Sequence, residues 1–89
     1  MRAVITVTGR DSEGIIAAVS GYCAERHANI LDISQSVLSE FFAMIMLVDI
    51  DRIDLPFAQF ADGLLEMGCA RGLDIRAMHE EIFNTMHHI

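Results

Sequence analysis

The chain has 89 residues, of which 53% are hydrophobic, and it carries a formal net charge of −7, with six arginines and no lysine. This length predicts one domain over residues 1–89 that buries only about 60–65% of its extended surface, so that oligomerisation would help it to fold. Scattered arginines in an acidic chain argue against nucleic-acid binding, and the missing lysine excludes Schiff-base chemistry. No apolar run reaches the roughly 18 residues of a membrane span, and we expect a cytoplasmic protein without membrane or nucleic-acid partners.

The N-terminal part predicts a strand followed by a helix. Residues 2–8 alternate between two sides in a β-branched composition, which is typical of a strand. Residues 14–28 carry apolar side chains at helical spacing, and Asp11 or Ser12 can serve as the N-cap. The expected apolar stripe consists of Ile16, Val19, Ser20, Cys23 and His27, widened by Ile15, Ala18 and Tyr22.

A hairpin is predicted in the middle of the chain. Residues 28–39 alternate as a strand at a sheet edge or with one wet face. Leu31, Ile33 and Val37 form its apolar side. Residues 41–50 are apolar on both parities, so this second strand is central or is covered on both faces.

The second half of the chain repeats the strand and helix pattern. Residues 57–72 have helical spacing, with Asp54 as a candidate N-cap and Pro56 in the first turn. Residues 73–79 alternate as a strand. The tail, residues 79–89, has apolar side chains spaced as in a short amphipathic helix.

The order β-α-β-β-α-β predicts an α+β fold, a ferredoxin-like βαββαβ sandwich. Right-handed crossovers and short connections favour a four-stranded antiparallel sheet with residues 2–8 and 41–50 in the central strands and both helices on one face. The other face needs a cover, because residues 41–50 are apolar on both sides. The C-terminal tail, a second subunit or both can supply it.

The stretch GRDSEGII, residues 9–16, has the glycine spacing of a phosphate-binding loop between a predicted strand and a helix. Such a loop also needs a lysine and a hydroxyl after the second glycine, and here Ile15 and Ile16 follow Gly14. Asp11 and Glu13 would add negative charge where the phosphates should lie. Phosphate binding is therefore disfavoured.

The same loop still offers the start of a helix. Its unpaired N–H groups and the positive end of the helix dipole suit a carboxylate, and Gly14 lets a ligand or another backbone approach closely. The simpler alternative is that Asp11 caps the helix and Gly14 packs tightly against its neighbours. Both interpretations stay open on these residues alone.

Nearly the whole chain resembles the ACT domain, a ferredoxin-like regulatory module that senses amino acids and related small ligands. The family motif is D-x-x-G followed by two apolar residues, with an Asn-Ile pair further along. DSEGII (residues 11–16) and ANIL (residues 28–31) match it. The closer resemblance, carried by residues 30–35, 44–49 and 79–89, is to small stand-alone ACT proteins related to glycine-cleavage-repressor-type regulators.

The resemblance implies a site shared between two subunits. ACT domains often pair side by side through their sheet edges and bind an amino acid between the first-helix loop of one subunit and the start of the second strand of the other. Backbone groups of Ser12, Glu13 and Gly14 would bind the ligand carboxylate, and Asp11 and Asn29 would hydrogen-bond its amino group or polar side chain. An ordinary turn role for Asn29 is the alternative. The ligand-binding residues expected are Asp11, Ser12, Glu13, Gly14, Ile15, Asn29, Ile30 and Leu31.

Other chemistry has less support in the sequence. No constellation of acids and bases for catalysis is recognisable, and we expect no enzymatic activity and no cofactor. His79, His87 and His88 are weak candidates for metal ligands, and the simpler interpretation is polar residues on the wet side of the tail. Cys23 and Cys69 are expected to be small, buried residues in a reducing compartment.

The function expected from these observations is a non-enzymatic regulatory domain. It would form a homodimer or a higher oligomer and bind an amino acid or a similar small carboxylate at the interface. The alternative is a dimerisation or protein-interaction module without a small ligand, and a metal-linked role of the tail comes third. The tail, residues 79–89, would pack on its own domain or on the dimer partner, and a separate effector protein would carry the output.

Overall fold

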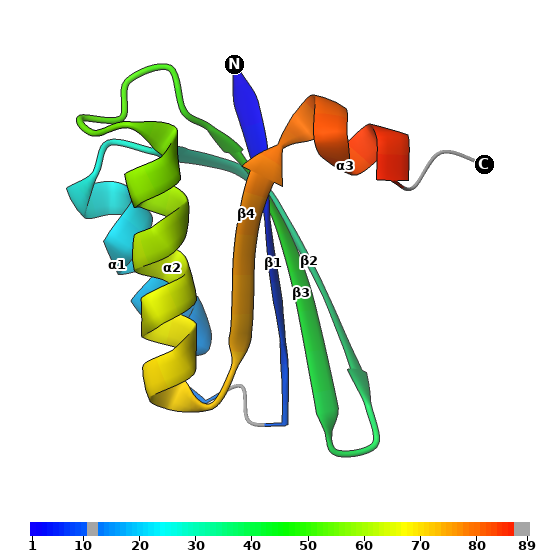
Figure 1. Cartoon of the computed structure of the whole chain (residues 1–89). Helices are drawn as coiled ribbons and strands as arrows, with labels where there is room; N and C mark the ends of the chain where they lie inside the picture. Colours follow the sequence, from blue (N-terminus) through cyan, green and yellow to red (C-terminus); the bar gives the residue numbers. More distant parts are fainter. Residues whose placement is uncertain (11–12, 87–89) are drawn as a thin grey trace.

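The computed structural model describes residues 1–10 and 13–86 and has four strands in one sheet, in the order β2-β3-β1-β4 (Figure 1). Helices α1 and α2 lie together on one face of that sheet. The elements are β1 (Arg2–Gly9), α1 (Ile15–Glu25), β2 (Asn29–Leu38), β3 (Phe41–Asp49), α2 (Phe57–Arg71), β4 (Asp74–His79) and α3 (Glu80–Met86). The predicted ferredoxin-like sandwich is confirmed, with β1 and β3 at the centre. Among the described residues, no helix has the length and apolar character that a bilayer span requires.

The strand register defines two ends of the sheet. Asn29 of β2 and Arg2 of β1 both lie opposite Asp49 of β3. Gly9 lies opposite Phe42, at the other end. We call these the Asn29 end and the Gly9 end. β2 runs from the Asn29 end to the Gly9 end, and α1 runs the opposite way, starting near the Gly9 end (Figure 1).

The core fills the space between the sheet and the two helices. Inward side chains of β1, β3 and β4 meet the apolar stripes of α1 and α2, and no described polar side chain is buried among them. Burial raises the pKa of the Cys23 thiol to about 11, because the interior disfavours the thiolate. The largest fully buried residues are Phe60, Ile5, Ile15, Met44, Met46, Leu64, Ile75, Val7, Val19, Val48 and Cys23.

Three predictions of burial in the helices are wrong. His27, expected in the stripe of the first helix, is exposed and lies beyond the end of α1. Ile16 is exposed, because α1 buries the stripe that begins one residue earlier. Cys69 is also exposed, because α2 turns the preceding residue, Gly68, to the sheet. The buried helix positions, four residues apart, are Ile15, Val19 and Cys23 in α1 and Phe60, Leu64 and Gly68 in α2.

The backbone determines where the two long helices begin. Gly14 is the N-cap of α1, with a φ of 72° and no side-chain cap, so the prediction that Asp11 or Ser12 fills this place is wrong. Glycine takes this left-handed conformation without the steric cost of a Cβ. The prediction that Asp54 is the N-cap of α2 is also wrong. The N-cap is Pro56, which has an extended backbone and directly precedes the first helical residue.

A close contact joins α1 to α2. The Tyr22 hydroxyl of α1 donates a 2.8 Å hydrogen bond to the Phe60 carbonyl oxygen, and the two rings lie 5.4 Å apart. A Cβ at Gly63 would overlap the Tyr22 hydroxyl oxygen. Glycine at this place in α2 therefore leaves the space that the hydroxyl occupies.

The second face of the sheet, which we call the open face, has no long helix over it (Figure 1). α3 contacts β1 and β4 at the Asn29 end and covers that end alone. Val4 is buried there, whereas Ile45, nearer the Gly9 end, is 44% exposed. By register and burial, the described side chains of the open face are Arg2, Val4, Thr6, Thr8, Asp32, Ser34, Ser36, Phe41, Ala43, Ile45, Leu47, Asp49, Asp74, Arg76 and Met78.

Candidate functional site

The first group of predicted ligand-binding residues surrounds the start of α1. Glu13 and Gly14 are exposed there, and Ile15 is buried in the core. Asp11 and Ser12 lie outside the described residues. The first helical hydrogen bond ends on the Gly14 carbonyl oxygen at 3.0 Å, so the N–H groups of the first turn have no intrahelical acceptor. This is the geometry of a helix start that can receive an anion.

The second group opens β2. Asn29 and Leu31 are exposed, and Ile30 is half-buried against the core. The register with β3 shifts between Ile30 and Asp32, so Leu31 has no residue directly opposite. A bulge of this kind bends a strand and redirects its side chains. The start of β2 is therefore distinct from the regular ladder that follows it.

The two groups lie at different ends of one chain. Asn29 lies at one end of the sheet, and Gly9 lies at the opposite end. Gly14 comes only five residues after Gly9 and therefore lies near the Gly9 end. The eight residues of β1 separate these ends by roughly 25 Å at about 3.3 Å per residue. A small ligand that touches both groups therefore needs two chains.

A polar cleft of about 440 Å³ lies around Asn29, and we call it the Asn29 cleft. Its volume falls within the range of small-molecule sites. The turn after α1, the first residue of β2, and the end of β3 with the turn that follows all contribute to it. The lining residues are His27, Asn29, Asp49, Asp51 and Arg52.

The two carboxylates of the Asn29 cleft have partners within the chain. Asp49 accepts a 2.9 Å hydrogen bond from the backbone N–H of Asp51. The Asp51 carboxylate accepts a hydrogen bond from the N-terminal amino group of Met1 and forms an ion pair with it. This hydrogen bond raises the pKa of the amino group above its usual value. The cleft therefore contains charges of both signs in an ordered arrangement.

Three other side chains of the Asn29 cleft are unpaired. His27, Asn29 and Arg52 have no side-chain hydrogen bond or ion pair with any other described residue. They offer an imidazole, a carboxamide and a guanidinium. A guanidinium binds carboxylates, and the nearby Asp49 carboxylate can accept from an ammonium group. The cleft can therefore hold a small molecule that carries both charges.

Of the five residues that line this cleft, Asn29 is a predicted site residue and the other four are not. Asp49, Asp51 and Arg52 lie in the stretch DIDR, at the end of β3 and in the turn after it. The local signal for these residues was that three charged residues follow an apolar strand within four positions. What places Asp49 beside Asn29 is the antiparallel register, which a local pattern does not contain.

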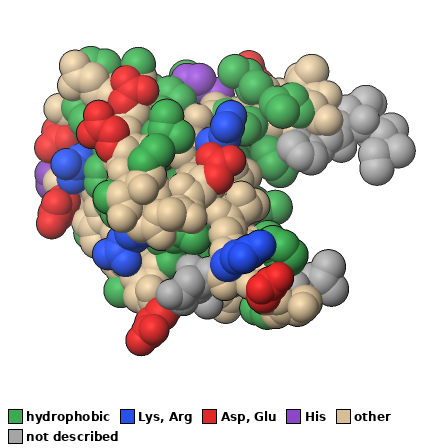
Figure 2. All heavy atoms as spheres, turned by 60° about the horizontal axis from the view of Figure 1, so that its bottom comes forward, with side chains coloured by type: hydrophobic (Ala, Val, Ile, Leu, Met, Phe, Trp, Pro, Cys, Tyr) green, Lys and Arg blue, Asp and Glu red, His purple; other side chains and the backbone are tan. Residues whose placement is uncertain are grey.

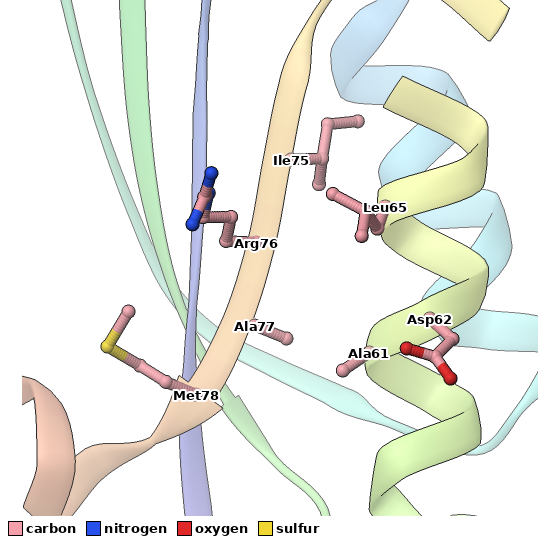
Figure 3. Close-up of a pocket in the computed structure, with 7 residues that line it drawn as sticks. All are labelled: Ala61, Asp62, Leu65, Ile75, Arg76, Ala77 and Met78. Atoms are coloured by element: carbon pink, nitrogen blue, oxygen red, sulfur yellow. The ribbon is translucent and has the colours of Figure 1, made fainter. Parts of the chain in front are cut away.

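A second cleft, of about 330 Å³, runs between α2 and β4 (Figure 3). Ile75 and Ala77 point toward α2, whereas Arg76 points to the other side of β4. Arg76 is paired there with Asp74, its Nε donating to Oδ1 at 2.9 Å. The polar groups near this cleft diverge, so it lacks the convergent polar lining of a ligand site.

A third cleft, of about 590 Å³, lies where α3 meets the sheet. Arg2 donates to Glu80 Oε1 from Nε at 3.1 Å and from Nη2 at 2.9 Å. The His79 ring lies against Phe57, with ring centroids 4.2 Å apart. These contacts hold the start of α3 to the sheet, which is a structural use of the polar groups in this cleft.

The metal candidates His79, His87 and His88 are only partly described. His79 contacts the ring of Phe57, and His87 and His88 lie outside the described residues. Within the part of the chain that the structure describes, no three metal-binding side chains form a group. The described residues therefore do not complete a three-ligand site around His79.

The two edge strands differ in how they are protected. β4 has six residues, including Asp74 and Arg76, and α2 packs beside it. β2 has ten residues, with exposed Ile33 and Val37 and a single charge at Asp32. A long, apolar edge without lysine or proline is a template for pairing with another chain. The β2 edge is therefore the better candidate for an interface.

Comparison with known proteins places this geometry in a family. The family model of the ACT domain matches residues 2–77. A UPF0237 protein from Methanocaldococcus jannaschii is 46% identical over 88 residues, which cover 99% of this chain and 98% of the relative. An ACT domain protein from Streptococcus pneumoniae has a TM-score of 0.81 at 40% identity, with 93% of each chain covered.

A more distant structure shares the fold. A proposed glycine cleavage system transcriptional repressor has a TM-score of 0.71 at 23% identity, covering 86% of this chain and 44% of that one. The resemblance inferred from the sequence motifs is confirmed by these matches. The chain belongs to the ACT domain family of regulatory, ligand-binding domains, and within it to the UPF0237 proteins.

Proposed function

We propose that this ACT domain forms a homodimer through its β2 edges and binds an amino acid or a similar small carboxylate where the two chains meet. Each site would combine the Asn29 cleft of one chain with the start of α1 of the other. The role is regulatory and includes no catalytic step. A separate effector protein would respond to the ligand-bound dimer.

Antiparallel pairing of two β2 strands would bring both groups of site residues together. β2 runs from the Asn29 end to the Gly9 end. A two-fold axis at its middle therefore sets the Asn29 end of each chain beside the Gly9 end of the other. α1 begins near the Gly9 end (Figure 1). Two symmetric sites follow from one strand pairing.

The two groups complement the charges of an amino acid. The N–H groups and dipole at the start of α1 attract a carboxylate, and Arg52 adds a charged donor. Asp49 can accept from the ammonium group, and the Asn29 carboxamide both donates and accepts. Glu13, exposed beside Gly14, repels a second negative charge. The ligand class that this arrangement favours is a neutral or cationic amino acid.

One observation is the main support for a ligand site shared between two chains. The unpaired side chains of His27, Asn29 and Arg52 converge on a cleft at the start of an unprotected edge strand. Convergent polar groups in a concave place are the usual mark of a small-molecule site. The free edge beside them indicates where a second chain would complete it.

Thermal unfolding with each of the twenty amino acids tests this proposal. A ligand at 100 times its Kd adds about 2.7 kcal/mol to the free energy of unfolding, which raises Tm by roughly 10 °C or more in a domain of this size. Gly14→Asp should abolish the shift, because it sets a carboxylate at the helix start. No atom outside its own loop lies within 4 Å of a Cβ there.

Gly14→Asn is the matched control for this experiment. Asparagine and aspartate both tolerate the positive φ of this position, and only aspartate adds a charge. Gly14→Asn should therefore keep most of the Tm shift. If no amino acid raises the Tm of the unmodified protein, the proposal that the ligand is an amino acid is wrong.

A protein-interaction module without a small ligand is the second candidate, and the exposed β2 edge favours it. Both candidates require edge pairing, so Val37→Glu should break that pairing and halve the wild-type mass in sedimentation measurements at micromolar concentration. Only the first candidate predicts a Tm shift with an amino acid. A stable wild-type monomer of 9.9 kDa would contradict both.

A further inference from the structure

We propose that two copies of this chain also pack through their open faces, and that each copy lays α3 over the exposed part of the other copy's sheet. This contact uses a different surface from the β2 edge. Both contacts together would produce a tetramer. The open-face contact does not depend on whether the edge contact or the ligand exists.

The open face is covered at one end only. α3 lies over its Asn29 end, where Val4 is buried. Toward the Gly9 end, Phe41, Ala43 and Ile45 are all exposed. Figure 2 shows a recess between α3 and the tip of the β2–β3 hairpin, with hydrophobic side chains inside it. Toward the Gly9 end, the described residues thus leave these apolar side chains and the neighbouring Thr8 and Ser36 without a cover.

α3 has an apolar side without a cover as well. It has seven residues, which is too short for a stable isolated helix. Ile82 and Met86, one turn apart, are both exposed, and none of its residues is buried. The helix also extends away from the body of the domain (Figure 1). A second apolar surface above the recess would stabilise it.

Two copies of this acidic chain can meet only where few like charges oppose each other, and the open face is such a place. The chain has a net charge of −7, and like charges oppose association through most of its surface. Beyond α3 the described open face has few charged groups: Arg76 pairs with Asp74 at 2.9 Å, Asp32 lies on β2, and the guanidinium carbon of Arg10 lies 5.6 Å from the centre of the Phe41 ring. Exposed Glu81 of α3 can pair with the Arg76 of a second copy.

The size of the contact requires the exchange of α3. Four strands spaced about 4.8 Å apart and up to about 26 Å long span at most roughly 500 Å², and α3 of the same chain already covers the Asn29 end of that area. A stable interface needs about 800 Å² from each partner. The sheet face alone falls short of this, and the exposed apolar side of α3 from each copy would add to the buried area. The result is a self-complementary contact with two-fold symmetry.

Sedimentation equilibrium of two matched variants tests the contact. Ile45 on the open face is 44% exposed, and Leu65 on α2, outside both contacts, is 42% exposed. Ile45→Glu places a charge in the contact and should halve the wild-type mass, whereas Leu65→Glu should leave it unchanged. If Ile45→Glu has the wild-type mass, the open-face contact does not exist.

A double variant separates this contact from the edge contact. Ile45→Glu combined with Val37→Glu should be a monomer, and Val37→Glu alone should remain a dimer held by the open faces. A monomeric Val37→Glu would overturn the open-face contact. If Val37→Glu keeps the full wild-type mass while Ile45→Glu halves it, the edge dimer fails and the open-face contact stands.

Disulfide cross-linking tests the exchange of α3. Ala43→Cys and Met86→Cys chains, each in a Cys69→Ser background and one of them tagged, are mixed and oxidised. The exchange predicts a disulfide between position 43 of one chain and position 86 of the other, and Cys23 is buried and does not compete. Leu65→Cys mixed with Met86→Cys should give no such product. If the 43–86 product fails to form, the exchange is wrong.

Discussion

The two faces of the sheet differ in how completely one chain covers them. On the helix side, Ile5, Met44 and Ile75 are fully buried, and no described polar side chain is buried among them. On the open face, Ile45 stays half-exposed, and α3 covers one end only. Residues 1–10 and 13–86 therefore complete one packed layer and leave most of the open face and the β2 edge without partners among themselves.

We expect the helix side of the sheet to determine the stability of each chain, and the other surfaces to determine assembly and ligand binding. The unpaired polar groups of the Asn29 cleft lie at the end of the sheet, outside the packed layer. Substitutions on the helix side should therefore lower the stability of each chain. Substitutions on the open face, at the β2 edge or in the cleft should change assembly or binding and leave the folding of one chain nearly unaltered.

Phe60→Ala is expected to have the largest effect on stability. Phe60 is fully buried and lies against the ring of Tyr22. Loss of a buried phenylalanine lowers the free energy of unfolding by about 3–5 kcal/mol, to be measured by urea unfolding. Leu65→Ala, on the exposed side of the same helix, should cost less than about 1 kcal/mol. Similar losses for both variants would contradict the contrast between the two surfaces.

Gly63→Ala should have an intermediate effect. The new methyl group would overlap the Tyr22 hydroxyl, and we expect a loss of about 1–3 kcal/mol. Gly21→Ala is the control, because no atom lies near a Cβ there, and it should stabilise α1 by roughly 0.5–1 kcal/mol. Adding Tyr22→Phe to Gly63→Ala should recover part of the loss. No recovery would mean that the hydroxyl is not the source of the strain.

The two cysteines should react at very different rates. The pKa of buried Cys23 is raised to about 11, whereas Cys69 is exposed. At pH 8 a thiol reagent should modify one cysteine per folded chain quickly, and Cys69→Ser should remove that fast phase. Above about pH 9 the unfolded Cys23 thiol ionises before the folded one, so stability should fall as the pH rises toward 11. Two fast thiols would contradict the burial of Cys23.

The smallest effect is expected at the N-terminus. Asp51 raises the pKa of the Met1 amino group above its usual value of 8.0. The stability from this exposed pair is present below pH 8 and is lost as the pH rises through the raised pKa. Thermal unfolding at pH 7 and above the raised pKa should show this small loss in the wild type and not in Asp51→Asn. An equal pH response in both proteins would exclude the pair as its source.

The fold could be predicted from the sequence because each element has a clear period. Strict alternation in β1 and the four-residue spacing in α2 identify their types, and the doubly apolar β3 indicates a central strand. The errors lie where neighbouring positions compete. Ile15 and Ile16 are both apolar, and the sheet rather than the helical period decides which is buried. Gly14 is the N-cap of α1 because of its left-handed backbone conformation. The usual preference of N-caps for side chains that accept a hydrogen bond does not predict a glycine there.

The candidate site was predictable only in part for the same reason. Asn29 and Gly14 have local motifs, and the resemblance to the ACT family draws attention to both. Asp49 and Arg52 have no local motif, because strand register rather than sequence distance brings them to Asn29. A site formed by two chains adds a further step, since neither chain contains the complete set.

Mixed dimers test the central claim, a site shared between two chains, most directly. Gly14→Asp should disable the helix start, and Asn29→Ala should disable the cleft. Neither variant alone has a complete site. A dimer with one chain of each kind has one intact site, built from the unmodified Asn29 of one chain and the unmodified Gly14 of the other.

The measurement is titration calorimetry of the two variants, first separately and then after mixing and exchange of chains. The probe is the amino acid that gives the largest wild-type Tm shift. A shared site predicts no binding by either variant alone and roughly a quarter of the wild-type stoichiometry in the mixture, because half of the dimers are mixed. No recovery of binding in the mixture would contradict a site shared between the two chains.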